Sequence, residues 1–267
     1  MHASPLPGTE SVPEAGSAPA LELEGLSKRF GPKVAVDHVT LSVPPGSFYG
    51  LVGPNGAGKT TSLSMAVGLL RPDAGHARIF GVDVWADPID ARARVGVLPD
   101  GLALPERLTG RELLTYLGRL RGLDKGTASE RAAELLEILE LDQAERTLVI
   151  DYSTGMRKKI GLATAMLHGP RLLVLDEPFE AVDPVSALTI RAMLKSFVAG
   201  GGSVVLSSHV MALVEQLCDH VAVIDKGRVA AAGSIDEVRA GGTLEDRFVE
   251  LVGAHVDAMK GPSWLAS

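Results

Sequence analysis

The sequence predicts an α/β domain with a parallel sheet, a small antiparallel β subdomain in front of it and a helical subdomain inserted in its middle. Two short apolar runs, at residues 172–175 and 203–206, do not alternate with polar residues and are typical of strands buried on both faces, as in parallel sheets. Apolar and polar residues alternate near the N-terminus, which indicates half-buried strands. Apolar residues at helical spacing recur within residues 102–165.

The first third of the chain predicts mainly strands. Residues 1–20 are rich in Pro, Ala, Ser and Gly and lack the apolar segment of a signal peptide, so we expect a disordered tail. Alternating residues at 21–24 and 39–43 predict two strands, and residues 48–52 predict a third. A glycine-rich loop follows, and then an apolar helix from about residue 60 to residue 70.

The rest of the chain alternates between helices and strands. Residues 113–120 and 132–139 predict two amphipathic helices, with glutamates on the solvent side of the second. A helix around residues 190–197 connects the two buried strands. A hairpin is predicted over residues 221–231 and a pair of short helices over residues 234–253.

Composition excludes several classes of protein. The net charge of −7 argues against a general nucleic-acid binder, which usually carries a basic excess. No run approaches the roughly 18 apolar residues of a membrane span, so we expect a soluble protein that contacts a membrane only through a partner. The single cysteine, Cys218, excludes an intrachain disulfide, and its apolar surroundings indicate a buried core residue rather than a nucleophile.

A phosphate-binding loop lies between the strand at 48–52 and the helix that follows it. The sequence there matches G-x-x-x-x-G-K-[ST], and its residues are Gly53, Pro54, Asn55, Gly56, Ala57, Gly58, Lys59 and Thr60. Glycines let backbone N–H groups point at a phosphate, and the helix N-terminus adds a favourable dipole. We expect Lys59 to reach the β- and γ-phosphates, Thr60 to hold Mg²⁺ and Thr61 to supply a second hydroxyl. This motif predicts a P-loop NTPase core.

The second half of the predicted site is the run Leu-Leu-Val-Leu-Asp-Glu-Pro at residues 172–178. An apolar strand that ends in a carboxylate places that charge at the edge of the sheet where ligands of open α/β sheets bind. We therefore expect Asp176 to help hold Mg²⁺, through water, and Glu177 to orient or deprotonate the attacking water. The alternative is that both acids only cap the strand end.

The order of these motifs resembles the ABC-transporter ATPase family over nearly the whole chain, from Leu21 to about Gly253. Residues 152–156, Tyr-Ser-Thr-Gly-Met, resemble the family signature Leu-Ser-Gly-Gly-Gln. The resemblance implies that two subunits pair head to tail and that Ser153 and Gly155 contact the γ-phosphate of ATP bound to the opposite subunit.

The resemblance assigns four further residues. It places Asp183 in the D-loop, where it would contact the nucleotide site, and makes His209 the switch histidine that contacts the γ-phosphate and supports Glu177. It matches Phe30 to the aromatic that stacks on adenine, with a core role as the alternative. Asp100 stands where the family usually has a glutamine that touches Mg²⁺ or water; alternatively, its segment serves mainly to couple to the transporter.

The resemblance implies the ATP-binding and hydrolysing subunit of an ABC transporter, with ATP and Mg²⁺ as cofactors. Asp100, the signature and Leu-Thr-Gly-Arg-Glu at residues 108–112 resemble bacterial ABC-2-type export ATPases. The implied partners are a second ATPase subunit in a homodimer and a separate transmembrane permease, which would place the chain in the cytoplasm on the inner face of the cell membrane. The ATPase domain would span residues 21–253, with a helical subdomain at about 102–165 and a tail at 254–267. A non-transport ABC ATPase, in iron–sulfur assembly, DNA repair or translation, is the alternative.

Overall fold

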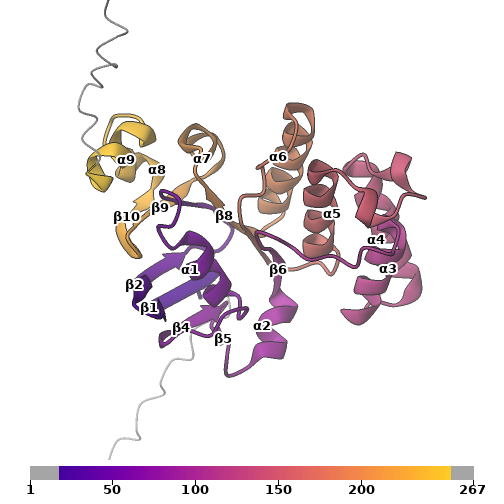
Figure 1. The fold of residues 1–267 in the computed structure, drawn as a ribbon, viewed down its shortest axis with the longest axis horizontal. Helices are drawn as coiled ribbons and strands as arrows, with labels where there is room; N and C mark the ends of the chain where they lie inside the picture. The colour runs from indigo at the N-terminus through magenta and orange to yellow at the C-terminus, as the bar shows by residue number, and fades with distance from the viewer. Residues whose placement is uncertain (1–17, 254–267) are drawn as a thin grey trace, which may run out of the picture.

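A computed structural model describes residues 18–253 of the 267-residue chain (Figure 1). The predicted C-terminal tail and most of the predicted N-terminal tail lie outside the described residues, at 254–267 and 1–17. The division into one domain and two tails therefore stays a prediction.

The central sheet has the strand order β10-β9-β3-β8-β7-β6. Its strands are β3 (Phe48–Val52), β6 (Val95–Leu98), β7 (Leu172–Leu175), β8 (Ser203–Ser208), β9 (His220–Asp225) and β10 (Arg228–Ser234). Neighbouring strands run parallel except β9 and β10, which form the predicted hairpin. Every residue of β7 and β8 is buried, so the interpretation of residues 172–175 and 203–206 as doubly covered strands is confirmed. The predicted strand β3 is likewise buried along its whole length.

A second, antiparallel sheet has the order β2-β1-β4-β5 and forms the predicted β subdomain. Its strands are β1 (Leu21–Phe30), β2 (Lys33–Val43), β4 (Ala74–Ile79) and β5 (Val82–Asp83). The alternation that predicted the first two strands is confirmed by the buried side chains of Leu21, Leu23, Leu41 and Val43. β4 was not predicted. Its Gly75 has φ +90° and lies so close to β1 that a Cβ there would come within 2.5 Å of the carbonyl oxygen of Glu24.

Helix α1 (Lys59–Ala66) follows β3 and contacts the antiparallel sheet. It is shorter than predicted, because Gly68 takes the left-handed φ of +73° and turns the chain away two residues after the helix ends. The remaining helices outside the insertion are α2 (Pro88–Arg94), α6 (Pro184–Ala199), α7 (Met211–Leu217), α8 (Ile235–Arg239) and α9 (Leu244–Val252). Helices α8 and α9 are the predicted C-terminal pair.

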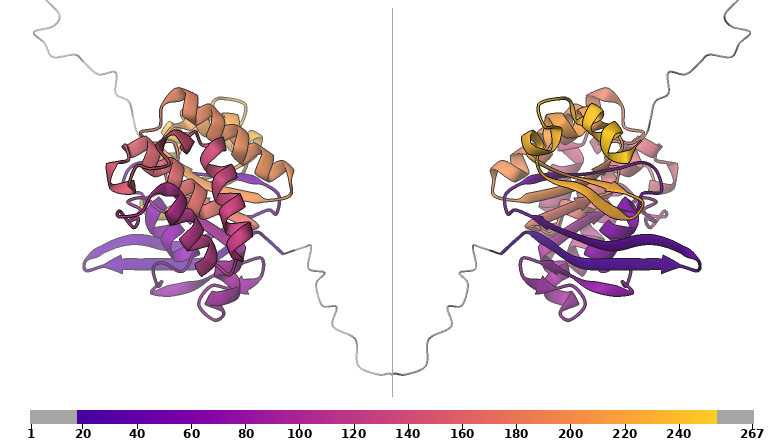
Figure 2. Two further views of the ribbon diagram at one scale, coloured as in Figure 1. Left: turned by 90° about the vertical axis from the view of Figure 1, so that its right-hand side faces the viewer. Right: turned by 90° about the vertical axis from the view of Figure 1, so that its left-hand side faces the viewer.

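The helical insertion lies at the opposite end of the molecule from α9 (Figures 1 and 2). It contains α3 (Gly110–Leu120), α4 (Lys125–Ile138), α5 (Thr154–Met166) and two 3₁₀ turns, η1 (Asp142–Ala144) and η2 (Val149–Asp151). Leu113 and Leu136 are fully buried where α3 and α4 pack together. Tyr116 and Leu120 of the predicted stripe are instead exposed on the far side of α3.

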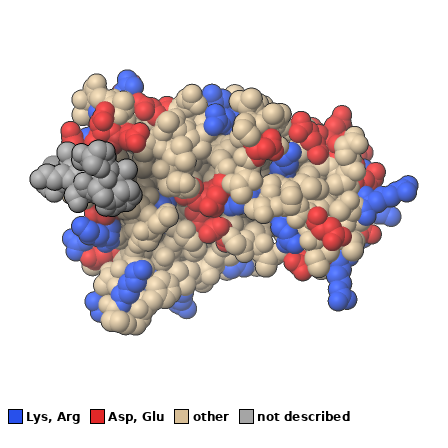
Figure 3. Space-filling model, turned by 45° about the horizontal axis from the view of Figure 1, so that its top comes forward, with Lys and Arg blue, Asp and Glu red and all other residues tan. Residues whose placement is uncertain are grey.

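Three expectations from composition can be compared with the structure: the burial of Cys218, the absence of a membrane span and the absence of a basic surface. Cys218 is buried, which confirms its interpretation as a core residue, and burial raises the pKa of its thiol. Among the described residues, no helix is long and apolar enough to cross a membrane. Acidic and basic side chains are interspersed on the described part of the face in Figure 3, and no broad basic area forms there.

Candidate functional site

The phosphate-binding loop connects β3 to α1 and is shaped by two glycines. Gly58 caps α1 with a left-handed φ of +108°, and a Cβ there would lie 2.5 Å from the carbonyl oxygen of Ala35. A Cβ on Gly53 would collide with the carbonyl oxygen of Ile224. The first turn of α1 has neither an acidic residue nor a side-chain cap. Its N–H groups and helix dipole are therefore directed toward the loop without a competing anion.

Lys59 is held inside this loop. Its side-chain nitrogen donates to the carbonyl oxygen of Gly53 at 2.7 Å, and the residue is only 7% exposed. Burial lowers the pKa of Lys59, whereas the negative charges of Glu177 and Asp176 oppose that shift. The loop thus presents one cation next to two carboxylates.

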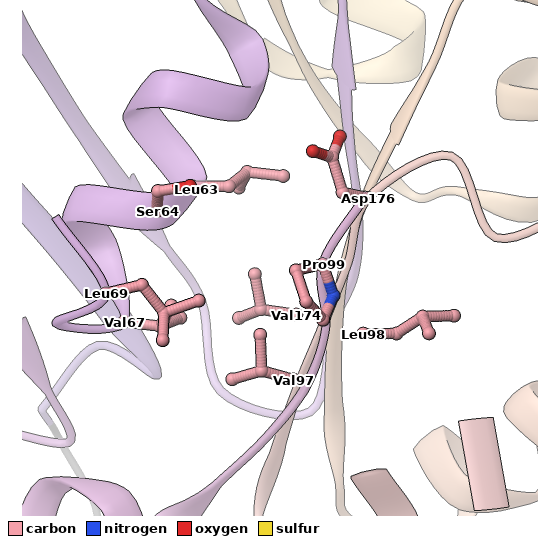
Figure 4. Close-up of a pocket in the computed structure, with 9 residues that line it drawn as sticks. All are labelled: Leu63, Ser64, Val67, Leu69, Val97, Leu98, Pro99, Val174 and Asp176. Carbon is pink, nitrogen blue, oxygen red and sulfur yellow. The ribbon is translucent and has the colours of Figure 1, made fainter. Parts of the chain in front are cut away.

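Asp176 follows the last residue of β7 and is buried. Figure 4 shows it at the end of the strand, with α1 across a small pocket lined mostly by apolar side chains. The strand register pairs Leu175 with Leu206, which brings Ser207 of β8 beside Asp176. The Ser207 hydroxyl donates to the Asp176 carboxylate and accepts from the Glu177 N–H at 2.9 Å.

The sequence analysis assigned a role to His209 but none to Ser207, two residues before it. The signal was present, because a polar residue at the end of an otherwise buried apolar strand requires a partner. Aligning the ends of the two buried strands would have named Asp176 as that partner.

Glu177 has an unusual backbone for a non-glycine residue. Its φ is +46°, in the left-handed region, a conformation that costs an L-residue roughly 1–2 kcal/mol. Its carboxylate oxygen lies 3.1 Å from Nδ1 of His209, the residue that follows β8. Strained backbone of this kind clusters at functional sites. The distance between Glu177 and His209 is therefore consistent with the predicted support of Glu177 by His209.

The structure brings most of the predicted site residues to one open cleft of about 590 Å³. Its lining includes Phe30, Asn55, Gly56, Ala57, Gly58, Lys59, Thr60, Thr61, Asp100, Glu177 and His209. Gly53, Pro54 and Asp176 lie outside this lining. Phe30 is 51% exposed at the end of β1, so its side chain is available for stacking and is not a core residue.

The structure does not bring Ser153, Gly155 and Asp183 to this cleft. Ser153 caps α5, where its hydroxyl accepts from the N–H of Met156 at 3.2 Å, and Gly155 is in the first turn of that helix. Asp183 caps α6 and accepts from the N–H of Ser186 at 2.9 Å. Hydrogen bonds from Ser186 hold the pKa of Asp183 below its usual value.

A P-loop at a helix N-terminus, with a buried carboxylate at a strand end and a second carboxylate next to it in the open cleft, defines a P-loop nucleoside-triphosphate-binding protein. Comparisons with known proteins narrow this class. The family described as ABC transporter matches residues 36–180. The chain belongs to this family, as the motif order suggested, and it is an ATP-binding subunit that hydrolyses ATP.

The relatives span most of the chain. The daunorubicin/doxorubicin resistance ATP-binding protein DrrA of Streptomyces peucetius is 42% identical over 221 residues, which cover 83% of the chain and 67% of that protein. The Nod factor export ATP-binding protein I of Ralstonia nicotianae is 40% identical over 226 residues, covering 85% of the chain and 70% of that protein. A solved structure of the ATP-binding subunit of an ABC transporter has a TM-score of 0.81 at 30% identity, and the match covers 87% of the chain and 99% of that subunit.

Proposed function

We propose that the chain is the ATPase of an exporter, pairs head to tail with a second copy around two ATP molecules, and drives a separate permease. The single observation that carries the catalytic part is the cleft where Lys59 faces the contacting pair Glu177 and His209. Export is supported by the relatives named for Nod factor export and for drug resistance.

In this proposal, Glu177 orients the water that attacks the γ-phosphorus and accepts its proton, while ADP leaves with the electrons of the broken bond. Lys59 and the N–H groups at the start of α1 neutralise charge on the β- and γ-phosphates. His209 supports the Glu177 carboxylate and faces the same phosphate from the end of β8.

The oxygen donors of the cleft fit Mg²⁺. Among residues 18–253, no group of three His, Cys, Asp or Glu residues could hold a metal by itself. Mg²⁺ typically takes one or two protein oxygens together with substrate phosphates. We propose the Thr60 hydroxyl and the Asp176 carboxylate as those protein oxygens. Bound there, the ion would neutralise phosphate charge.

The positions of Ser153, Gly155 and Asp183 outside the cleft are an argument for the proposed dimer. Ser153 and Gly155 are at the start of the 13-residue helix α5, whose first turn carries no acidic residue. Such a helix start favours an anion. Because these residues do not line the cleft of their own subunit, we propose that they contact the γ-phosphate held by the other copy. We place Asp183 at the same contact.

The proposed docking face for the permease is the outer side of α3. A shallow pocket there is lined by Leu108, Arg111, Glu112, Thr115, Tyr116 and Arg119. Tyr116 and the nearby Leu120 are exposed apolar side chains on one helix. Clustered exposed apolar side chains of this kind are typical of protein contact sites.

The transport role predicts a functional complex with a membrane protein. Co-expressed with a membrane protein encoded in the same operon, the chain should co-purify with it and hydrolyse ATP faster than it does alone. In inverted vesicles, ATP should drive substrate inward, which corresponds to export from the cell. A drug such as doxorubicin serves as the fluorescent probe. No complex with the membrane protein, or probe movement outward from the inverted vesicles, would contradict the assignment.

Phe30 should determine affinity for the adenine ring. Phe30→Ala is expected to weaken ATP binding about tenfold, because stacking on an aromatic contributes about 1–3 kcal/mol per base. Isothermal titration with ATP measures the change. Phe30→Trp keeps an aromatic face and should retain the parent affinity. Equal binding by the alanine variant would remove Phe30 from the site.

A further inference from the structure

Lys158 of α5 reaches the catalytic region from a pocket that adjoins the nucleotide cleft and shares Asp100 with it. Its side-chain nitrogen donates to the backbone carbonyl oxygen of Glu177 at 3.0 Å. The same nitrogen lies 4.0 Å from a carboxylate oxygen of Asp100, and the Lys158 side chain is only 14% exposed. Thus one largely buried ammonium group joins the helical insertion to two residues at the end of the central sheet.

The hydrogen bond from Lys158 is made to Glu177, the residue with the left-handed backbone. Three side chains hold Glu177 in that conformation. The Ser207 hydroxyl accepts from its N–H at 2.9 Å, His209 contacts its carboxylate at 3.1 Å, and Lys158 donates to its carbonyl oxygen. The N–H of Glu180 also donates to that carbonyl oxygen, at 3.2 Å, within the local turn. A strained backbone persists only where its surroundings fix it, and Lys158 supplies a charged donor to the carbonyl oxygen of Glu177.

Asp100 is the counter-charge of Lys158. A largely buried ammonium group requires a compensating anion. Among the described residues, Asp100 is the carboxylate within 4.0 Å of it. Asp100 is 56% exposed, and it lines both the nucleotide cleft and an adjoining pocket of about 380 Å³ beside Lys158. Asp100 can therefore act on the site through Lys158.

We propose that Lys158 is a positioning residue for ATP hydrolysis: it fixes the backbone of Glu177, and Asp100 holds its charge in place. The proposal rests on the proposed role of Glu177 in activating water. Lys158 is in α5, which Ser153 caps and whose first turn contains Gly155, so it also links the proposed phosphate contact of the second copy to Glu177. Asp100 then contributes through a lysine rather than as a metal ligand.

The test uses the full chain with ATP and Mg²⁺. Lys158→Met should lower kcat about tenfold, because small displacements of catalytic groups have effects of this size or more, while KM stays within about twofold. Lys158→Arg keeps a charged donor and should restore most of kcat. Asp100→Asn should lower kcat about threefold in the parent chain and cause no further loss in Lys158→Met, because residues in one network are not additive. If Lys158→Met does not fold, Lys158→Ala, which also lacks a donor, takes its place with the same expectation.

Lys28 provides a matched control. It also donates to a backbone carbonyl oxygen, that of Arg71 at 2.9 Å, and pairs with a carboxylate, that of Asp73 at 2.7 Å. Its side chain is 16% exposed, close to the value for Lys158. Lys28→Met should lower Tm without changing kcat, so a fall in kcat specific to Lys158 would not reflect general loss of stability.

Two outcomes overturn the proposal: an unchanged kcat in Lys158→Met, or additive losses when Asp100→Asn is combined with it. Glu177→Gln is measured alongside. If hydrolysis is lost in Glu177→Gln but kept in Lys158→Met, the positioning role alone fails. If Glu177→Gln keeps the parent rate, the proposed function of Glu177 fails as well.

Discussion

Glu177→Gln is expected to lower the rate of ATP hydrolysis by about 100- to 10,000-fold, the usual contribution of a general base. ATP affinity should stay within about twofold of the parent, because binding rests on the P-loop and Phe30 rather than on this carboxylate. Glutamine keeps the size of the side chain and can still contact Nδ1 of His209, which lies 3.1 Å from the Glu177 carboxylate. The loss would thus report the missing proton acceptor.

Phosphate release under steady-state conditions measures this change, and titration with ATP measures affinity separately. Glu137→Gln is a suitable control, since it makes the same chemical change at an exposed position on α4. Parent-rate hydrolysis by Glu177→Gln would mean that another group activates the water.

Ser153→Arg is expected to reduce hydrolysis about 100-fold, the scale of losing a transition-state anion contact, while a single chain still binds ATP. An arginine at the start of α5 would occupy the space proposed for the γ-phosphate of the other copy. The folded state should survive, because losing the helix cap costs about 1 kcal/mol against a typical stability of about 5–15 kcal/mol.

Ser153→Ala separates the two effects of this substitution, since it removes the cap to Met156 without adding bulk. We expect it to retain far more activity than the arginine variant. ATP titration should give the same affinity for all three proteins. Hydrolysis by Ser153→Arg at the parent rate would exclude a phosphate contact at Ser153.

The parts of the fold that the sequence predicted are those where local pattern determines structure. Continuous apolar runs predicted β7 and β8, because a strand covered on both faces needs no polar residues. The chemistry of the cleft was predictable for a similar reason. The P-loop motif determines the geometry of the loop and places the ammonium group of Lys59 in it. The end of β7 determines the position of Asp176.

Contacts between distant segments could not be predicted. β4 contains Gly75 and His76 and pairs through its backbone with β1, so its side chains carry little strand signal. The ammonium of Lys158 acquires its role from the packing of α5, which no local sequence pattern indicates. These contacts appear only when the chain is folded.

The head-to-tail pairing of two copies around ATP is tested most directly by the mass of the Glu177→Gln chain in solution. Analytical ultracentrifugation would compare this variant without nucleotide and with ATP and Mg²⁺. We expect ATP to convert a single chain into a stable pair, because bound ATP is no longer consumed, and we expect the Glu177→Gln/Ser153→Arg double variant to stay single. A Glu177→Gln chain that binds ATP yet keeps the mass of one chain would contradict the pairing.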